Sequence, residues 1–452
     1  MHSLVRIILF ISFVFFILSS CKNETSKTYP PVNQTGEIKN IKCRADTSYS
    51  YHIYLPYEYK KGKKFPAIYF FDAHARSIQV LDSLKKAAEK FNYIIIVSND
   101  YRNGVKDLKS IVNKTLNDSK KRFSLNKERI YTAGFSGGAR LAARVANVFP
   151  YIKGCIACSA GITAPGNIDN RKTFHIIHIT GKTDFNYMEV HQKHNKIKSN
   201  QIEKCILVFN GSHQLPTKQY FTEALLFLEL KAMKDNLKEE NRSFVQHFYK
   251  KQFQKIDSLD RAGNEKILYE EIQKTKNFFK NLKNLRKIDK IAAKHDFFKN
   301  NKKPDFKREQ FIRNKYTQAL RTKNISWWYR EVDKIDTLVY KTKNRSKKYF
   351  YQRIRNYLEM ITYLFLEKAF SKEDTGEIRK YLSIYEKLNT RNPDYLFAKS
   401  RYHLLINQID SAESYLEKSI NNGLQDIHYR LQNDKLWNSL YKKEMLDEFF
   451  NK

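Results

Sequence analysis

Through about residue 236, short hydrophobic runs alternate with longer stretches in which apolar residues recur at helical spacing. Seven runs carry the Val, Ile, Tyr and Phe residues that are typical of buried strands: SYSYHIYLP, PAIYFF, YIIIVS, RIYTAG, IKGCIACSA, TFHIIHIT and CILVF. The amphipathic run KQYFTEALLFLELKAM closes this part of the chain. The alternation predicts an α/β fold, a doubly wound and mostly parallel sheet with helices on both faces.

The pattern changes in the second half of the chain. Eleven of the 14 glycines and seven of the nine prolines lie before residue 217. From residue 237 onward, Lys, Glu, Leu, Phe and Tyr recur at helical spacing, which predicts an all-α half. We expect a basic helical region at 237–348 and a second helical domain at 349–452.

Part of this last region resembles a known helical repeat. NPDYLFAKSRYHLLINQIDSAESYLEKSINNG, residues 392–423, is similar to a tetratricopeptide repeat, in which small residues such as Ala398 and Ala412 let two antiparallel helices pack closely. The resemblance implies that residues 349–452 form a tetratricopeptide-like domain. Such a domain is a candidate surface for a protein partner.

The N-terminus has the layout of an export signal. Arg6 precedes the apolar run IILFISFVFFIL, and small residues precede Cys21. The run is shorter than the roughly 20 apolar residues that a spanning helix needs. LSSC also resembles the cleavage box of bacterial lipoproteins, in which the cysteine carries the lipid, and Lys22 at the next position favours the outer membrane in that class. We therefore expect a signal peptide at 1–20, a lipid-anchored and exported mature protein, and a linker at 21–42.

The formal charge of +36 raises the question of a nucleic-acid partner. The basic surplus is spread along the chain, with one concentration at 271–350, and many lysines stand beside asparagines. This distribution is typical of a lysine-rich proteome, and the hydrophobic fraction of 41% indicates a folded protein. We expect no nucleic-acid partner, and attraction to an anionic membrane surface is the alternative for the basic charge.

Four cysteines follow Cys21, and two of them form a C-x-x-C pattern. Cys155 and Cys158 lie in a predicted strand, where residues three apart point to opposite faces. They cannot close a local disulfide or bind one metal ion together. We expect them to be small core residues, and a disulfide at Cys43 stays open.

The stretch RIYTAGFSGGARLAARVA places a serine where a predicted strand meets a predicted helix. Gly134, Ser136 and Gly138 form the pattern G-x-S-x-G, whose small residues allow a sharp turn that exposes the serine hydroxyl above the sheet. A serine hydroxyl needs a neighbouring base to become a nucleophile, and that base needs an orienting carboxylate.

Two later loops supply these groups. GKTDFNY places Asp184 just after the strand TFHIIHIT, and NGSHQLP places His213 just after CILVF. Their chain order, serine then acid then histidine, is that of the hydrolase layout, with Asp169 as the rival acid.

The other histidines near these loops are weaker candidates for the base. His175 and His178 lie inside a predicted strand, which indicates buried structural residues. His191 and His194 lie in a basic helical stretch that we expect at the surface.

GFSGGAR, GKTDFNY and NGSHQLP together resemble the nucleophile, acid and base segments of the α/β-hydrolase superfamily. The resemblance covers about residues 43–234, particularly to the esterase branch of feruloyl esterases, polyhydroxybutyrate depolymerases and dienelactone hydrolases, and implies an α/β-hydrolase catalytic domain at 43–236. SYSYHIYLPYEYKKGKKFPAIYFFDAHARS also resembles the opening strands of that branch and of related Bacteroidetes lipoproteins. The resemblance implies that Ser136 is the nucleophile, His213 the general base and acid, and Asp184 the residue that orients the histidine.

Attack by the serine would form a tetrahedral intermediate with a negatively charged oxygen, the oxyanion, which needs two hydrogen-bond donors. The backbone N–H of Gly137 follows the nucleophile at a helix N-terminus, which makes it the first candidate. Many relatives carry His-Gly in the loop after PAIYFF, whereas this chain has FFDAHARS. Ala73 and His74 are therefore the candidates for the second donor. The sequence shows no metal-binding or phosphate-cradling pattern, and we expect no cofactor and no metal.

These observations predict a lipid-anchored serine hydrolase that cleaves a carboxylic ester, small or polymer-linked, through an acyl-enzyme. A peptidase of the same fold is the nearest alternative. A catalytically idle hydrolase scaffold that binds a protein partner through its helical half is the alternative from another class. The intact set of Ser136, Asp184 and His213 favours an enzyme.

Overall fold

The computed structural model describes residues 34–162, 174–197, 202–263, 265–295, 306–438 and 440. The chain divides into the units Met1–Gln34 and Thr35–Lys452, and every element below lies in the second unit. The expected signal peptide, the acylation of Cys21 and the rival acid Asp169 lie outside the described residues and stay predictions. No helix in the described part of the chain is both long and apolar enough to cross a membrane.

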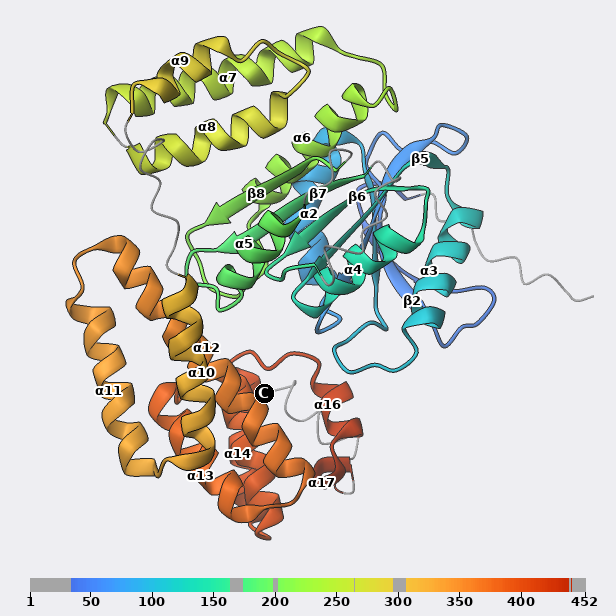
Figure 1. Ribbon diagram of the computed structural model, residues 1–452. Helices are drawn as coiled ribbons and strands as arrows, with labels where there is room; N and C mark the ends of the chain where they lie inside the picture. Colours follow the sequence, from blue (N-terminus) through green and yellow to red (C-terminus); the bar gives the residue numbers. More distant parts are fainter. Residues whose placement is uncertain are drawn as a thin grey trace, which may run out of the picture. The chain divides into compact units, whose positions relative to one another are not determined.

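An eight-stranded sheet organises the first half of the second unit (Figure 1). Its strand order is β1-β2-β4-β3-β5-β6-β7-β8; β1 and β2 are antiparallel to their neighbours, and the pairs from β4 to β8 are parallel. The bounds are β1 Ile38–Lys42, β2 Ser50–Tyr54, β3 Phe65–Asp72, β4 Ile94–Ser98, β5 Leu125–Phe135, β6 Ile152–Cys158, β7 His175–Gly181 and β8 Lys204–Phe209. The predicted α/β class with a mostly parallel sheet is confirmed.

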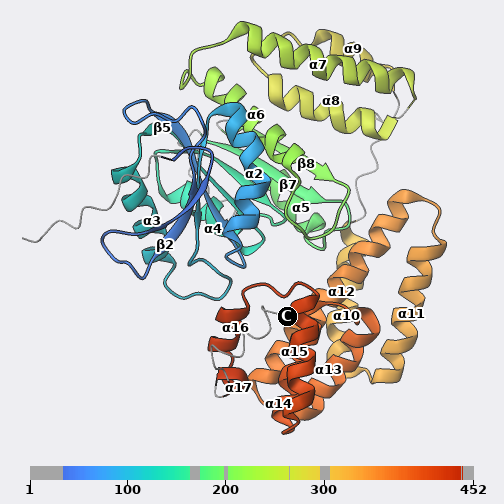
Figure 2. The same cartoon turned by 180° about the vertical axis from the view of Figure 1, so that it is seen from behind.

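Helices cover both faces of this sheet (Figures 1 and 2). On one face, Ile68 and Phe70 of β3 belong to a core that includes side chains of α2 and α6. On the other face, the hydroxyl of Tyr69 lies 2.8 Å from Ser119 of α3, and Thr132 of β5 donates a 2.9 Å hydrogen bond to α4. The helices are α2 Ser77–Phe91, α3 Leu108–Arg122, α4 Gly137–Val148, α5 Tyr187–Lys196 and α6 Lys218–Lys234.

The predicted linker at 21–42 extends too far. Ile38–Lys42 forms the edge strand β1, which pairs with β2 from Ile38 opposite Tyr54 to Lys42 opposite Ser50. The strand is short and mostly polar, IKNIK, and Ile41 is its one buried residue. An edge strand held mainly by backbone hydrogen bonds needs no continuous hydrophobic run, so the pattern did not identify it.

Three helices follow α6 in the chain. Val245 of α7 and Phe278 and Phe279 of α8 join the same core as α2 and α6, and a smaller apolar cluster ties α7, α8 and α9 together. Their bounds are α7 Arg242–Arg261, α8 Glu265–Phe279 and α9 Arg286–Ala293.

The remaining helices pack around two further apolar cores, one shared by α10 to α14 and a smaller one shared by α14 to α17. The predicted boundary between residues 348 and 349 is wrong. That boundary falls inside α12, which spans Arg345–Ser371, because α10 and α11 pack their apolar sides on α12, α13 and α14. The bounds are α10 Phe306–Thr322, α11 Ile325–Lys341, α13 Thr375–Leu388, α14 Pro393–Leu405, α15 Ile409–Asn421, α16 Ile427–Asn433 and α17 Lys435–Asn438. The predicted all-α second half is confirmed, while its tetratricopeptide character stays a prediction.

The cysteines of the described part of the chain, Cys43, Cys155, Cys158 and Cys205, are buried and unpaired with one another. Cys158 lies in the core shared with α2 and α6, whereas Cys155 lies beside Thr132, which faces α4. The C-x-x-C residues therefore point to opposite faces of the sheet, as the strand pattern predicts. Burial raises the pKa of the Cys155 thiol to about 12, which keeps it protonated and unreactive at neutral pH.

Candidate active site

Ser136 occupies a sharp turn between β5 and α4. Its backbone has φ 55° and ψ −120°, a positive-φ conformation that residues other than glycine rarely adopt and that costs on the order of 1–3 kcal/mol. The turn is held from the neighbouring strand, because the Ser136 N–H donates a 2.9 Å hydrogen bond to the carbonyl of Cys158. The strained backbone projects the hydroxyl past the carboxyl end of β5.

The two motif glycines are required by close backbone packing. A Cβ on Gly134 would lie 2.2 Å from the carbonyl oxygen of Gly138, and a Cβ on Gly138 would lie 1.9 Å from the carbonyl oxygen of Phe71. Both neighbours are backbone atoms that cannot move aside cheaply. The G-x-S-x-G pattern therefore reflects the geometry of this turn.

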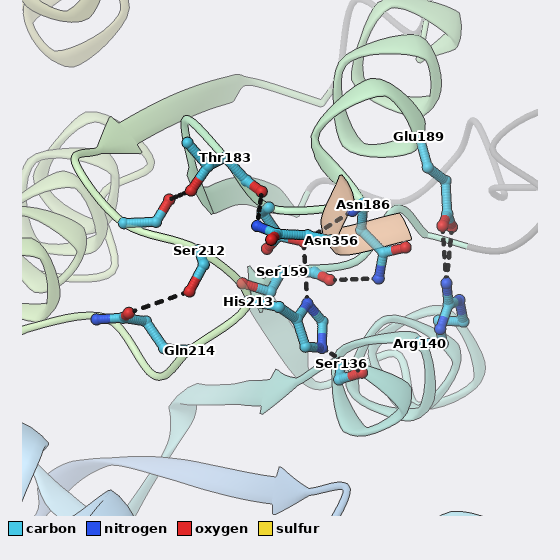
Figure 3. Close-up of polar contacts among 12 residues, drawn as sticks. Ser136, Arg140, Ser159, Thr183, Asn186, Glu189, Ser212, His213, Gln214 and Asn356 are labelled. Atoms are coloured by element: carbon cyan, nitrogen blue, oxygen red, sulfur yellow. Dashed lines mark hydrogen bonds and ion pairs between the residues drawn. The ribbon is translucent and has the colours of Figure 1, made fainter. Parts of the chain in front are cut away.

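His213 links the other two predicted residues, and Figure 3 shows its contact with Ser136. Its Nε2 lies 3.0 Å from the Oγ of Ser136, and its Nδ1 lies 2.9 Å from Oδ1 of the fully buried Asp184. The imidazole stacks on Phe185 at a centroid distance of 4.1 Å and contacts Phe135 at 4.9 Å. The structure thus brings together all three residues that the sequence singled out, in the order that proton transfer requires.

The hydrogen bonds define which nitrogen of His213 carries the proton. A carboxylate oxygen can only accept, so Nδ1 donates to Asp184, and Nε2 is left as an acceptor for the Ser136 hydroxyl proton. Asp184 Oδ1 also accepts a 2.7 Å hydrogen bond from the backbone N–H of Asn186. The Asn186 side chain in turn donates to the carbonyl of Ser159 at 2.8 Å, which ties the acid loop to the end of β6 (Figure 3).

The acid and base loops are fastened to each other. The backbone N–H and the hydroxyl of Thr183 both donate to the carbonyl of Gly211, at 3.0 and 2.8 Å. The Lys182 N–H donates to the carbonyl of Phe209 at 2.9 Å. These contacts fix the residue before Asp184 to the loop that carries His213, so the two side chains keep their register.

The first predicted oxyanion donor is the backbone N–H of Gly137, and Gly137 is the first residue of α4. It therefore lies at the positive end of the helix dipole, directly beside the nucleophile.

The loop after β3 is shaped by Asp72. Its Oδ2 accepts 3.1 Å hydrogen bonds from the backbone N–H groups of His74 and Arg76, and the Arg76 guanidinium binds both carboxylate oxygens at 2.9 and 2.8 Å. Burial alone would raise the pKa of Asp72, but the hydrogen bonds and the charge of Arg76 outweigh burial and lower it. Because the His74 N–H is already engaged, Ala73 is the better candidate for the second oxyanion donor.

We expect Arg76→Ala to destabilise the fold by about 3 kcal/mol at pH 7, because it leaves the Asp72 carboxylate buried without its charged partner. The pKa of Asp72 is lowered by folding, so this stabilisation is present above the unfolded pKa of about 3.9 and is lost as the pH falls through the folded pKa. The difference between wild type and variant should therefore narrow at about pH 3.

Urea unfolding at the two pH values measures the effect. The control is Arg261→Ala, which breaks the exposed i,i+4 pair with Asp257 and should change stability by less than about 1 kcal/mol. Equal losses in both variants, or a loss at Arg76 that does not depend on pH, would contradict the assigned role of the buried pair.

Sequence reasoning missed Asn103 at this edge. Its side-chain oxygen lies 1.8 Å from where a Cβ on Gly137 would stand, and its backbone N–H donates to the carbonyl of Ala73 at 3.0 Å. Asn103 therefore packs against Gly137 and holds the backbone of Ala73, the two residues that carry candidate oxyanion donors. Its position a few residues after the strand YIIIVS, at the carboxyl edge of the sheet, was the available signal.

One expectation about the other histidines is wrong. His175 and His178 are buried in β7 as predicted, but His194 is also buried, with its Nδ1 3.1 Å from Nδ1 of His178. Burial lowers the pKa of His178 to about 3 and of His191 to about 4, so both rings stay neutral at neutral pH. The helix that carries His191 and His194 was expected at the surface because of its lysines, but His194 packs against His178 of the sheet.

Groups of three or more His, Cys, Asp or Glu side chains placed to hold a metal ion do not occur in the described residues. No protein-family model matches the chain, and no curated protein matches its sequence.

Solved structures resemble part of the chain. An esterase from Pyrobaculum calidifontis is 14% identical, and the match covers 44% of this chain and 87% of that one with a TM-score of 0.36. Est1E from Butyrivibrio proteoclasticus is 12% identical over 42% of this chain and 98% of its own, at a TM-score of 0.35. An acylaminoacyl peptidase from Pyrococcus horikoshii is 15% identical over 45% of this chain and 42% of its own, at 0.34. At these identities and scores the similarity assigns neither an activity nor a substrate.

Proposed function

We propose that this chain is a serine hydrolase that cleaves a carboxylic ester through an acyl-enzyme intermediate. The observation that carries the proposal is the continuous hydrogen-bonded path from Ser136 Oγ to His213 Nε2, 3.0 Å, and from His213 Nδ1 to Asp184 Oδ1, 2.9 Å. A path of this kind, at the carboxyl edge of a parallel sheet and on a strained turn, supports nucleophilic catalysis. The lipid predicted at Cys21 would hold this activity at a membrane surface.

In the proposed reaction, the Ser136 oxygen attacks the carbonyl carbon of the ester while His213 takes the hydroxyl proton at Nε2. The positive imidazolium is stabilised by Asp184, and the negative oxygen of the tetrahedral intermediate accepts a hydrogen bond from the Gly137 N–H. When the intermediate collapses, the bond to the leaving alcohol breaks and His213 donates the proton to that alcohol. Water then attacks the acyl-Ser136 by the same route, releasing the acid and restoring the serine.

Phe185 and Phe135 support this role of His213. Two aromatic rings packed on the imidazole restrict its rotation, so the ring stays aligned between nucleophile and acid. Positioning of this kind contributes to catalysis because the reacting atoms begin close to the geometry in which they react.

The test is a panel of short, long and aromatic acyl esters, compared with peptide anilides that present the same acyl groups. We expect turnover of at least one ester class, and amide cleavage well below it. Faster cleavage of the anilides would replace the esterase proposal with a peptidase of the same fold. A chain that turns over neither set would instead fit the idle scaffold.

A further inference from the structure

The loop that carries Asp184 is also held from the helical half of the chain. Arg353 of α12 donates through Nη1 to the carbonyl of Lys182 at 3.1 Å, and Asn356 donates through Nδ2 to the carbonyl of Thr183 at 2.8 Å. Figure 3 shows the Asn356 contact beside His213 and Ser136. The two carbonyls belong to the two residues that directly precede Asp184, so α12 fixes the backbone that sets the position of the acid.

Arg353 is itself rigidly placed. It is buried, and its guanidinium pairs with the buried Glu309 of α10 through hydrogen bonds of 2.8 to 3.3 Å. Glu309 also accepts a 2.6 Å hydrogen bond from Arg313. A buried charge network of this kind contributes little net stability, but it fixes the orientation of its members.

The same guanidinium reaches the far end of the acid loop. It lies 4.6 Å from the ring centroid of Tyr187, the first residue of α5, in a cation–π contact. Burial raises the pKa of Tyr187 to about 12, so the ring stays neutral. Arg353 therefore contacts the chain on both sides of Asp184, at Lys182 and at Tyr187.

The helical half also contacts the loop that precedes Asn103, next to the candidate oxyanion donors. Arg102 lies 3.5 Å from the carboxylate of Asp426 and 4.2 Å from the ring centroid of Tyr429 in α16. Arg102 precedes Asn103 and forms an isolated antiparallel β-bridge with His74, so this contact supports the loop that packs against Gly137. The helical half therefore contacts both loops that lie beside the nucleophile, the acid loop and the loop next to Gly137.

We infer that the helical half is part of the catalytic apparatus, and that Arg353 and Asn356 are positioning residues that hold the segment 182–187 and keep Asp184 in line with His213. The inference rests on the proposed hydrolase activity. Neither side chain touches the reacting atoms, and both act through the backbone next to the acid. In an enzyme, a displacement of about 1 Å costs on the order of 100-fold in rate.

The test is the variant Asn356→Ala in the full chain, assayed with an ester that the wild type turns over. We expect kcat to fall by about 10- to 100-fold, while KM changes by less than about twofold, because the group orients the acid and does not bind the ester. Asn356→Asp, which keeps the size but cannot donate, should be as slow as the alanine variant. Asn356→Gln, which keeps a donor, should recover part of the rate.

The matched control is Asn389→Ala. The Asn389 amide donates a 3.0 Å hydrogen bond to Glu359 and accepts a 3.2 Å one from the backbone N–H of Arg391, so the control removes amide contacts that lie wholly within the helical half. Labelling with a fluorophosphonate probe separates folding from positioning. A positioning defect lowers the labelling rate at full final stoichiometry, whereas a folding defect lowers the stoichiometry.

Hydrogen–deuterium exchange of peptides spanning 182–187 gives a readout that needs no activity. We expect faster exchange in Asn356→Ala than in wild type or in Asn389→Ala. Wild-type turnover per labelled site in Asn356→Ala would overturn the inference, and so would a rate loss that the control shares. If the wild type neither labels nor turns over any ester, the proposed function fails, and unchanged exchange at 182–187 would then overturn the positioning role separately.

Discussion

Replacing Ser136 with alanine is expected to abolish covalent labelling by a fluorophosphonate probe and to lower ester turnover by about 10⁶-fold. The probe reacts only with a hydroxyl that a neighbouring base has activated, and the Ser136 Oγ is the hydroxyl that lies 3.0 Å from His213 Nε2. Turnover that remains would come from oxyanion stabilisation and binding, which do not need the nucleophile. Labelling is measured by intact mass on wild type and variant at equal concentration.

Ser212→Ala is the matched control for this prediction. Ser212 stands next to His213, and its hydroxyl makes only a long 3.4 Å contact with Gln214, so its loss should leave labelling unchanged (Figure 3). Equal labelling of wild type and Ser136→Ala would show that the probe reacts elsewhere. A wild type that is not labelled at all would favour the idle scaffold, in which the triad geometry is kept without reactivity.

The sheet was predictable from the sequence because its central strands are buried on both faces. Such strands must be mostly apolar, and every residue of β3, β4 and β7 is buried. The runs for β2 and β8 are buried mainly at alternate residues and were predicted from their β-branched and aromatic residues. The sequence pattern did not predict two features, for physical reasons. β1 is a polar edge strand. The start of α12 lies in the lysine-rich stretch RSKKYF, so the predicted boundary at 348 falls inside a continuous helix. Neither feature leaves a break in hydrophobic periodicity.

The catalytic candidates were predictable because the fold places them by chain order. Asp184 and His213 each follow a parallel strand, and parallel strands end at one edge, so their convergence on Ser136 follows from topology. The choice between Ala73 and His74 as second oxyanion donor required the structure. It depends on the hydrogen bond from the His74 N–H to Asp72, which the sequence does not predict.

The contacts of Arg353 and Asn356 could not be predicted from the sequence. They join positions separated by 171 and 173 residues through a helix whose face is chosen by tertiary packing. Chain order and strand position, which located the acid and the base, carry no information about a contact between two halves of a chain.

Replacing Asp184 with asparagine is expected to lower kcat by about 10⁴-fold while the chain stays folded. The amide fills the same space and can donate to Nδ1 of His213, which forces the ring proton onto Nε2. Nε2 then points a hydrogen at the Ser136 hydroxyl and cannot accept its proton. The variant also loses the charge that stabilises the imidazolium. The measurement is kcat for the best ester, with circular dichroism to confirm folding.

Asp235→Asn provides the same substitution in a second histidine–aspartate pair. Asp235 Oδ2 lies 2.5 Å from Nε2 of His175, which lies in β7 outside the catalytic loops. Burial would raise the pKa of Asp235, but the hydrogen bond from His175 outweighs it and lowers the pKa, so this change should reduce stability and leave kcat near the wild-type value. If kcat is low in Asp184→Asn and normal in Asp235→Asn, the loss comes from the imidazole of His213, which faces Ser136. Near-normal turnover in Asp184→Asn would transfer the orienting role to another acid, with Asp169 the first to test.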